Sequence, residues 1–307
     1  MQLQQLRYFL AVAETRHFTR AAEAAHVAQP SLSQQIRALE RELGAELFHR
    51  TRGNIALTDA GDALLPLARR ILADTESARL AVQETVQLRR GRVRLGAPPS
   101  LCTSLVPDVL RVFRDRYPGV ALVVREGGSR DLVGWLAAGE LDLALTITRP
   151  SGEQEPALAV TELLHEELVL VAAGRPGRRK VRVTELKGRP LVMFREGYDV
   201  REATLAACRA AGFEPEFAVE GGEMDAVLGF VRAGIGPAVV PGMVAARSGL
   251  AVTAFAGPGL GRTIAVAQGH EVPLTRAAEA LRDTLLAHLR DAARDGELPP
   301  GTRLLLP

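Results

Sequence analysis

Residues 18–50, FTRAAEAAHVAQPSLSQQIRALERELGAELFHR, predict two short helices joined by a tight turn. In the second helix, Leu32, Ile36, Leu39 and Leu43 recur at one helix face and are expected to pack inward. The opposite face carries hydroxyl, amide and guanidinium groups, the types that contact base edges and phosphates in a DNA groove. These side chains are Ser31, Ser33, Gln34 and Arg37. The stretch therefore predicts a DNA-binding helix-turn-helix.

Flanking residues indicate where these helices begin and end. Pro30 suits the first turn of a helix and follows Gln29 on the turn, whereas Gly44 is a helix stop. Thr19 is placed to cap a helix whose alanines are small enough to let two helices cross closely. A further amphipathic helix, which would complete a small core, is predicted from Leu3, Leu6, Phe9, Leu10 and Ala13.

The segment ELFHRTRGNIALTDAG, residues 46–61, predicts a β-hairpin wing with Gly53-Asn54 at its turn. Arg50 and Arg52 lie on this wing, where guanidinium groups suit phosphates or a narrow minor groove. The alternative is that both arginines only solvate a surface loop. Their position beside a complete helix-turn-helix favours DNA contact.

Residues 59 to about 89 contain no strong turn signal and predict one long helix. Thr58 is its expected cap, and Pro66 predicts an early bend. A helix buried within one domain is the alternative, but about thirty residues is long for that role. A mixed seam at steps of seven is formed by Leu64, Ile71, Ala78 and Thr85.

Beyond residue 90, strand-like and helix-like stretches alternate. The strand-like runs are VRLGA, ALVVRE, LDLALTI, LVLVAA, PLVMF, PAVVP and TIAVAQG, and the helix-like stretches lie near 101–117, 130–139, 200–212, 223–234 and 275–293. This alternation predicts parallel sheets with helices on their faces. The segment is long enough for two such α/β subdomains.

From Met1 to Gly61, and especially in the helix-turn-helix string and in LTDAG, the chain resembles the winged helix-turn-helix of bacterial LysR-type transcriptional regulators. Its length and later organisation extend the resemblance to nearly the whole sequence. The resemblance implies a homodimer or homotetramer that binds double-stranded promoter DNA and is switched by a small-molecule effector. The positions that match DNA-facing residues of the family are Thr19, Gln29, Pro30, Ser31, Ser33, Gln34 and Arg37, with Arg50 and Arg52 on the wing.

The family pattern also implies how the chain is divided. It places an all-α winged helix-turn-helix domain at 1–58, a linker and dimerisation helix at 59–90, an effector-binding domain at 91–295 and a tail at 296–307. The paired long helices would hold two recognition helices about one DNA turn (~34 Å) apart, or a multiple of it. The tail is either loose or docked through its leucines, Leu304 to Leu306.

The effector-binding domain of the family is similar to type 2 periplasmic binding proteins, which have two α/β lobes around a ligand cleft. On that pattern, lobe one is 91–161 plus 267–295 and lobe two is 162–266, with hinge crossings near 161 and 266.

Candidate ligand residues follow the strands, because helix N-termini at the carboxyl ends of strands offer free amide hydrogens. Ser100 follows VRLGA, is expected to cap a helix and matches a family position that contacts effector. The other candidates are Ser129, Thr148, Phe194, Arg195 and Glu223. Ser, Thr and Glu at helix starts are also ordinary caps. If Arg195 points into the cleft, a carboxylate effector is expected.

The two cysteines are Cys102 and Cys208. The string REGYDVREATLAAC is similar to the peroxide-sensing branch of the family, in which two cysteines nine residues apart form a regulatory disulfide. Cys208 matches the second position, but Asp199 stands at the first, so no local disulfide switch is expected. Cys208 is expected to pack as a small apolar residue. A bond to Cys102 would require Cα atoms within about 7 Å.

Composition narrows the function classes. The 307 residues carry a net charge of +2, and residues 1–58 hold seven arginines against five glutamates, so DNA affinity must depend on where the arginines lie. No apolar run approaches the roughly twenty residues of a membrane span, and no signal-peptide pattern opens the chain. We therefore expect a soluble, cytoplasmic protein without a membrane partner.

Enzyme motifs were sought, and the sequence contains no GxSxG, HExxH, P-loop lysine motif or paired CxxC. The six histidines do not cluster at metal-ligand spacing. No catalytic residue, metal or cofactor is expected. Two alternatives to a DNA-binding regulator remain: a solute-binding or transport protein built on the same lobes, and an enzyme that uses the bilobed cleft.

Overall fold

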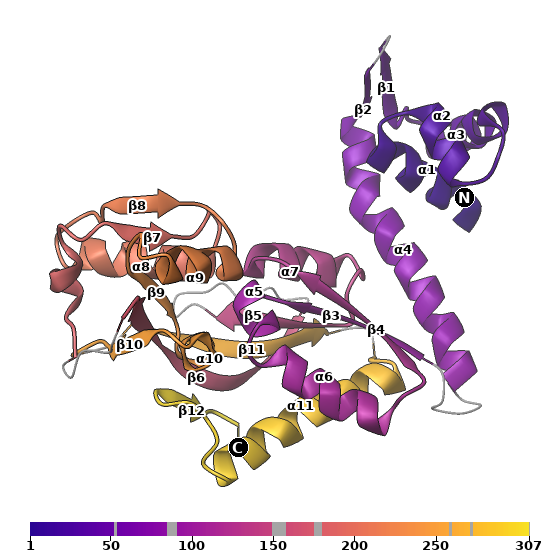
Figure 1. The fold of residues 1–307 in the computed structure, drawn as a ribbon. Coiled ribbons are helices and arrows are strands. Elements are labelled where there is room, and N and C mark those ends of the chain that lie inside the picture. The colour runs from indigo at the N-terminus through magenta and orange to yellow at the C-terminus, as the bar shows by residue number, and fades with distance from the viewer. Residues whose placement is uncertain are drawn as a thin grey trace. The chain divides into compact units, whose positions relative to one another are not determined.

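The computed structural model describes residues 1–51, 54–84, 91–148, 158–174, 180–257, 260–270 and 273–306 (Figure 1). Its contacts divide the chain into two compact units. One consists of Met1–Thr85 and Ala137–Glu140, and the other of Val86–Leu136 and Leu141–Pro307. Among the described residues, no helix is both long and apolar enough to cross a membrane.

The N-terminal unit is a winged helix-turn-helix followed by a long helix. Its elements are α1 (Leu3–Thr15), α2 (Phe18–Ala24), α3 (Gln29–Leu43), the antiparallel hairpin β1 (Phe48–Thr51) and β2 (Asn54–Leu57), and α4 (Asp59–Glu84). The predicted helices and wing are confirmed. The hairpin residues 52 and 53 and the predicted end of the long helix lie outside the described residues.

The buried stripe of α3 contains three of the four leucine and isoleucine positions that the sequence predicts. Leu32, Ile36 and Leu39 are fully buried, but Leu43 is 43% exposed. Gly44 adopts the left-handed conformation (φ 72°) that ends the helix. Because the chain reverses there, Leu47 completes the seam in place of Leu43, with 1% of its surface exposed.

The N-termini of α2 and α4 are capped by different residue types. At α2 the cap is His17, whose Nδ1 accepts from the Thr19 amide at 3.2 Å, so the predicted capping role of Thr19 is wrong. At α4 the Thr58 hydroxyl accepts from the Gly61 amide at 3.1 Å, as expected of a cap. Pro66 lies inside α4, as the sequence predicts.

The second unit begins with a mixed sheet. Its central strands are β3 (Gly91–Ala97), β4 (Val120–Glu126) and β5 (Leu143–Thr148), which are parallel, and two long strands, β6 (Leu158–Ala172) and β11 (Gly261–Gly269). β11 runs antiparallel to both β5 and β6. The predicted parallel pairing therefore holds for β3, β4 and β5, whereas β11 adds antiparallel pairing that the sequence did not predict.

Helices cover both faces of this part of the sheet (Figure 1). The helices are α5 (Pro99–Cys102), α6 (Val106–Arg116), α7 (Ser129–Ala137) and α11 (Arg276–Arg294). Leu143 and Leu145 pack in one core with α6 and α11, whereas Ala144 packs with α7. This alternation is the two-residue period of a strand with both faces buried.

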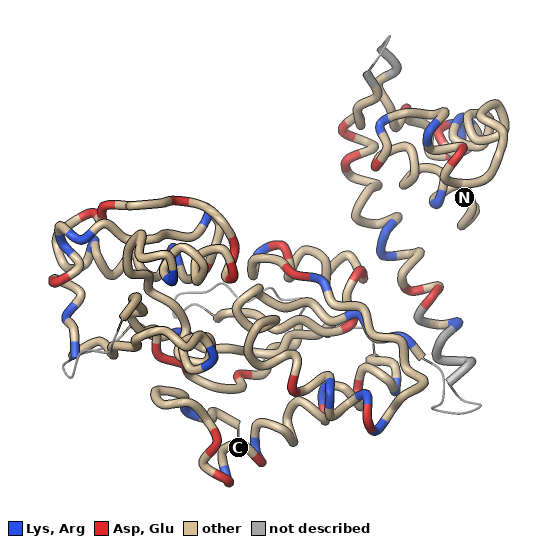
Figure 2. Tube along the Cα trace, in the orientation of Figure 1, with Lys and Arg blue, Asp and Glu red and all other residues tan. Residues whose placement is uncertain are grey.

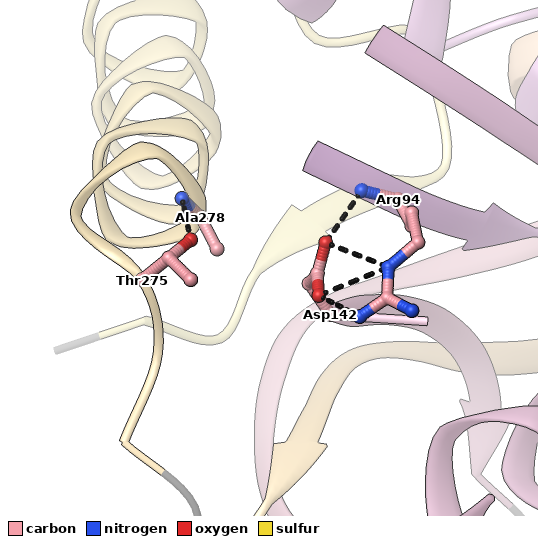
Figure 3. A network of polar contacts seen from close by, with 4 residues as sticks. All are labelled: Arg94, Asp142, Thr275 and Ala278. Atoms are coloured by element: carbon pink, nitrogen blue, oxygen red, sulfur yellow. Dashed lines mark hydrogen bonds and ion pairs between the residues drawn. The ribbon is translucent and has the colours of Figure 1, made fainter. Parts of the chain in front are cut away.

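Local polar contacts fix the ends of these elements (Figure 3). Arg94 in β3 donates to Asp142 from its amide at 2.7 Å and from its guanidinium, which ties β3 to the residue preceding β5. The Thr275 hydroxyl accepts from the Ala278 amide at 3.3 Å and caps α11.

Most of the remaining elements of the second unit form a second α/β subdomain. It contains the 3₁₀ turn η1 (Val183–Leu186), β7 (Leu191–Met193), α8 (Asp199–Ala210), β8 (Phe217–Glu220), α9 (Met224–Arg232), β9 (Ala238–Pro241), α10 (Gly242–Ser248) and β10 (Ala251–Ala254). β7 and β8 are a parallel pair, while β9 and β10 run antiparallel to β6.

Two separate hydrophobic cores mark two lobes within this unit. β6 contributes Leu164 to the lobe-one core and Leu168 to the lobe-two core. β11 contributes Ile264 to the first, and Leu260, directly before β11, belongs to the second. The chain therefore passes from one lobe to the other within a few residues of 166 on β6 and of 262 on β11. We call this point the lobe crossing.

The C-terminal segment is docked. β12 (Thr302–Leu304) pairs antiparallel with β6, with Thr302 opposite Glu166. Leu304 and Leu306 pack against the lobe-one core. Of the two alternatives that the sequence left open for the tail, docking through its leucines is the one observed.

Candidate DNA interface and ligand site

An open groove lies along the outer face of α3. The groove has a volume of ≈ 900 Å³ and runs along α3 to the turn that follows it. Five of the predicted DNA-contacting residues line it: Gln29, Pro30, Ser33, Gln34 and Arg37. The remaining lining residues are Glu40, Arg41, Gly44, Ala45 and Glu46. Sequence periodicity therefore brings these polar side chains to one surface.

Buried contacts beneath the groove hold this surface in place. Glu40, which is 8% exposed, accepts from the Leu47 amide at 3.1 Å and so ties the end of α3 to the start of the wing. The side-chain amide of Gln5 donates from Nε2 to Gln35 Oε1 at 3.2 Å and ties α3 to α1. Helix α3 can therefore present its outer side chains without bending.

The other predicted DNA residues are not among the residues that line the groove. Thr19 is exposed on α2, and Ser31 is exposed in the first turn of α3. Arg50 lies in β1, and Arg52 is outside the described residues. Basic and acidic residues are interspersed along the described part of this unit (Figure 2).

The lobe crossing in the second unit contains a buried ion pair. Glu166 and Arg262 face each other across β6 and β11 and are 0% and 6% exposed. Arg262 Nε donates to Glu166 Oε2 at 2.9 Å, and Glu166 Oε1 accepts from the Met243 amide at 2.7 Å. The carboxylate is thus satisfied on both oxygens, which compensates much of its desolvation.

Ser100 belongs to this same cluster. It lies inside α5, whose cap is Pro98, so the predicted capping role of Ser100 is wrong. Its hydroxyl accepts from Arg262 Nη1 at 2.9 Å, and its side chain is fully buried. The residue therefore links lobe one to the lobe crossing.

A second contact joins the lobes near the first turns of α7 and α8. The Ser129 hydroxyl donates to Asp199 Oδ2 at 2.8 Å and accepts from the Ile147 amide at 3.1 Å. Gly128 lies so close to the Gly197 carbonyl that a Cβ atom there would stand 3.1 Å from its oxygen. Ser129 therefore holds a carboxylate of the chain itself.

Three other predicted ligand residues are already engaged. Arg195 donates to Glu223 at 2.6 Å, and both side chains are nearly half exposed. Glu223 is the cap residue of α9, but its carboxylate serves this pair rather than the helix. Phe194 is 1% exposed and stacks on Tyr198, with ring centroids 4.5 Å apart.

Thr148 ends β5, half buried, and its hydroxyl donates to the Thr263 carbonyl at 3.4 Å. It therefore belongs to the pairing of β5 with β11.

Sequence reasoning missed the residues that connect these candidates. Glu166, Arg262 and Tyr198 are buried polar groups at the lobe boundary, and the sequence analysis assigned a role to none of them. The one available signal was a charged residue inside an otherwise apolar strand, as with Arg262 in GRTIAVAQG. Among the described residues, no group of His, Cys, Asp and Glu could hold a metal ion.

Comparison with known proteins finds a family match for each of the two units. Residues 3–62 match the family described as "Bacterial regulatory helix-turn-helix protein, lysR family", and residues 87–290 match the "LysR substrate binding domain". The chain is 35% identical over 245 residues to the transcriptional dual regulator GltC of Bacillus subtilis (strain 168), covering 78% of this chain and 81% of GltC.

Two solved structures extend the likeness to full length. A full-length OxyR variant from Pseudomonas aeruginosa superposes with a TM-score of 0.71 at 27% identity, covering 93% of this chain and 94% of that one. Full-length CbnR in complex with its target DNA gives a TM-score of 0.69 at 25% identity, covering 95% and 100%. The chain therefore belongs to the LysR family of transcriptional regulators, with a helix-turn-helix domain followed by a substrate-binding domain.

Proposed function

We propose that this regulator binds promoter DNA through the outer face of α3 and acts as a homodimer or homotetramer in the cytoplasm. The single observation that carries the DNA assignment is the groove along α3, which gathers Gln29, Pro30, Ser33, Gln34 and Arg37. Polar side chains gathered on one face of a helix suit a recognition helix that enters the major groove of DNA. The DNA in the CbnR complex supports the same mode of action.

A modestly charged domain needs more than one copy to bind tightly. The interspersed charges of the N-terminal unit supply few phosphate contacts per copy. Helix α4 offers a surface for pairing, since Leu67 is 57% exposed on it. Two paired copies would read two half-sites of one operator.

We further propose that a small-molecule effector binds at the boundary between the two lobes of the second unit. The supporting observations are the residues that meet there from both lobes, Ser100 and Ser129 from lobe one and Asp199 and Arg262 from lobe two. An effector that binds one lobe arrangement better would shift the population toward it and so change how the DNA-binding units are spaced. A carboxylate effector at Arg195 stays a prediction, and such a ligand would compete with Glu223.

The DNA assignment is tested by a gel-shift titration of the full chain with DNA from the region upstream of its own gene, at low salt. Arg37→Ala is expected to weaken binding at least tenfold, because one lost contact is worth about 1–3 kcal/mol and each dimer loses two. Arg7→Ala is the matched control: Arg7 is exposed on α1, outside the groove, and its loss should change affinity less than twofold.

Two results would contradict the proposal. One is equal weakening by both substitutions, which would indicate a general charge effect. The other is failure of the intact oligomer to bind any promoter-proximal DNA.

A further inference from the structure

Two hydrogen-bond donors at the lobe boundary are buried without an acceptor. Within the described residues, Tyr198 Oη and Arg262 Nη2 are inaccessible to solvent and have no hydrogen-bond partner. The two residues are only 4% and 6% exposed. A buried donor without an acceptor destabilises the fold, and in native proteins it usually indicates a missing partner or a functional role.

The contacts of Arg262 leave one side of its guanidinium free. Nε donates to Glu166 and Nη1 donates to Ser100, each at 2.9 Å. Nη2 also lies 2.9 Å from Glu166 Oε2 as part of the ion pair, but within the described residues it has no hydrogen-bond partner. A guanidinium has five N–H groups, and those on Nη2 remain available.

Tyr198 is held rigidly and lies where charges of both lobes act on it. Its ring stacks on Phe194 at an interplanar angle of 12°. Burial raises the pKa of Tyr198, and Glu223 of lobe two raises it further, while Arg262 lowers it and Glu126 of lobe one raises it. The hydroxyl therefore stays protonated as a donor and stands near the lobe crossing.

The charges around these donors are already balanced or negative. Glu166 neutralises Arg262, and Glu223 neutralises Arg195. Glu126 and Asp199 add carboxylates at the same boundary. An anion placed there would lose hydration without meeting an unpaired cation, whereas an uncharged oxygen would meet a free donor at a smaller desolvation cost.

We propose that Tyr198 Oη and Arg262 Nη2 each donate to an uncharged oxygen of the effector, as in an amide, ketone or ester. This inference rests on the proposed function, since it names the chemical class that the lobe boundary accepts. It assigns to Tyr198 a role in ligand specificity. It also differs from the prediction of a carboxylate at Arg195.

The experiment uses the full-length protein and two probes of nearly equal shape, acetamide and acetate, followed by ligand-observed NMR. Acetamide is expected to bind weakly, and acetate at least fivefold more weakly. Tyr198→Phe should weaken acetamide binding about fivefold, the effect of one neutral hydrogen bond. Tyr117→Phe, on the lobe-one core, is the matched control and should leave acetamide binding unchanged.

A second measurement separates ligand binding from a structural role. If Tyr198 has no partner in the free protein, Tyr198→Phe removes an unsatisfied group, and the thermal midpoint of the free protein should stay equal or rise. A structural hydrogen bond would lower it instead.

The inference is wrong if acetamide binds to Tyr198→Phe as it does to the unaltered protein, since the two donors then hold water alone. It is also wrong if acetate binds more tightly than acetamide, an outcome that favours the carboxylate prediction. DNA binding is measured separately in the gel shift, so either outcome leaves the DNA assignment standing.

Discussion

The groove along α3 and the boundary between the lobes are polar sites built in opposite ways. In the groove, donors such as Gln34 and Arg37 stand exposed on one helix, and the buried face of that helix fixes them. At the lobe boundary, Glu166, Arg262 and Ser100 are buried and satisfy one another across strands. Substitutions in the groove should therefore change binding, whereas substitutions at the lobe crossing should change folding first.

The largest effect is expected from Glu166→Gln. The amide keeps the shape but leaves the Arg262 guanidinium buried without a counter-charge, which should cost about 3–5 kcal/mol of unfolding free energy. Urea unfolding followed by the fluorescence of Trp135, the single tryptophan of the chain, measures this in the second unit.

Glu167→Gln is the matched control, because the neighbouring Glu167 is exposed and its loss should change stability by no more than about 0.5 kcal/mol. If both substitutions cost the same, the buried ion pair does not support the lobe crossing.

The groove gives the next largest effect. Gln34→Ala should weaken binding to the preferred operator by about 1–3 kcal/mol and reduce discrimination at one base pair, because a glutamine amide can bind an adenine edge through two hydrogen bonds. Gel shifts with single-base operator variants measure both changes. Gln35→Ala is the control, since Gln35 faces Gln5 of α1 rather than the groove. Uniform weakening across all operator variants would show that Gln34 contacts only the backbone.

These two sites also differ in how far the sequence predicts them. The groove follows from residues within one helix, whose period alone separates Ser33 and Gln34 from Leu32 and Ile36. Even the error at Leu43 is local, because it depends on the turn at Gly44.

The lobe boundary has no such local pattern. Ser100 and Arg262 are 162 residues apart in sequence, and Glu166 and Arg262 are 96 apart. Strand order and register bring them together. The sequence therefore predicts Ser100 and Ser129 as polar residues near strand ends, but neither their partners nor the antiparallel course of β6 and β11.

A smaller effect is expected at the contact between Ser129 and Asp199. Ser129→Ala, Asp199→Ala and the double variant form a mutant cycle, and the coupling energy between them should be about 1 kcal/mol in unfolding free energy. Partial exposure of both side chains keeps this below the value of the buried pair. A coupling near zero would mean that the two lobes are not held together by this hydrogen bond.

The smallest effect concerns the cysteines, for which the sequence predicts no local disulfide switch and the structure predicts low reactivity. Burial, assisted by Glu126, raises the pKa of Cys102 from 9.0 to about 12. Burial also raises the pKa of Cys208, with Glu214 contributing. Because the thiolate is the reactive form, three pKa units make Cys102 roughly a thousandfold less ionised at neutral pH than an ordinary cysteine.

The measurement is alkylation of the folded protein by iodoacetamide at pH 7, read by mass spectrometry, with urea-unfolded protein as the control. Both thiols should react much more slowly in the folded protein. The sign of the linked stability follows from the raised pKa of Cys102: its contribution is fully present below pH 9 and is lost as the pH rises toward 12, so alkali and not acid weakens the fold through this group. Rapid alkylation of folded Cys102 at pH 7 would contradict the raised pKa of its thiol and reopen a thiol-based response.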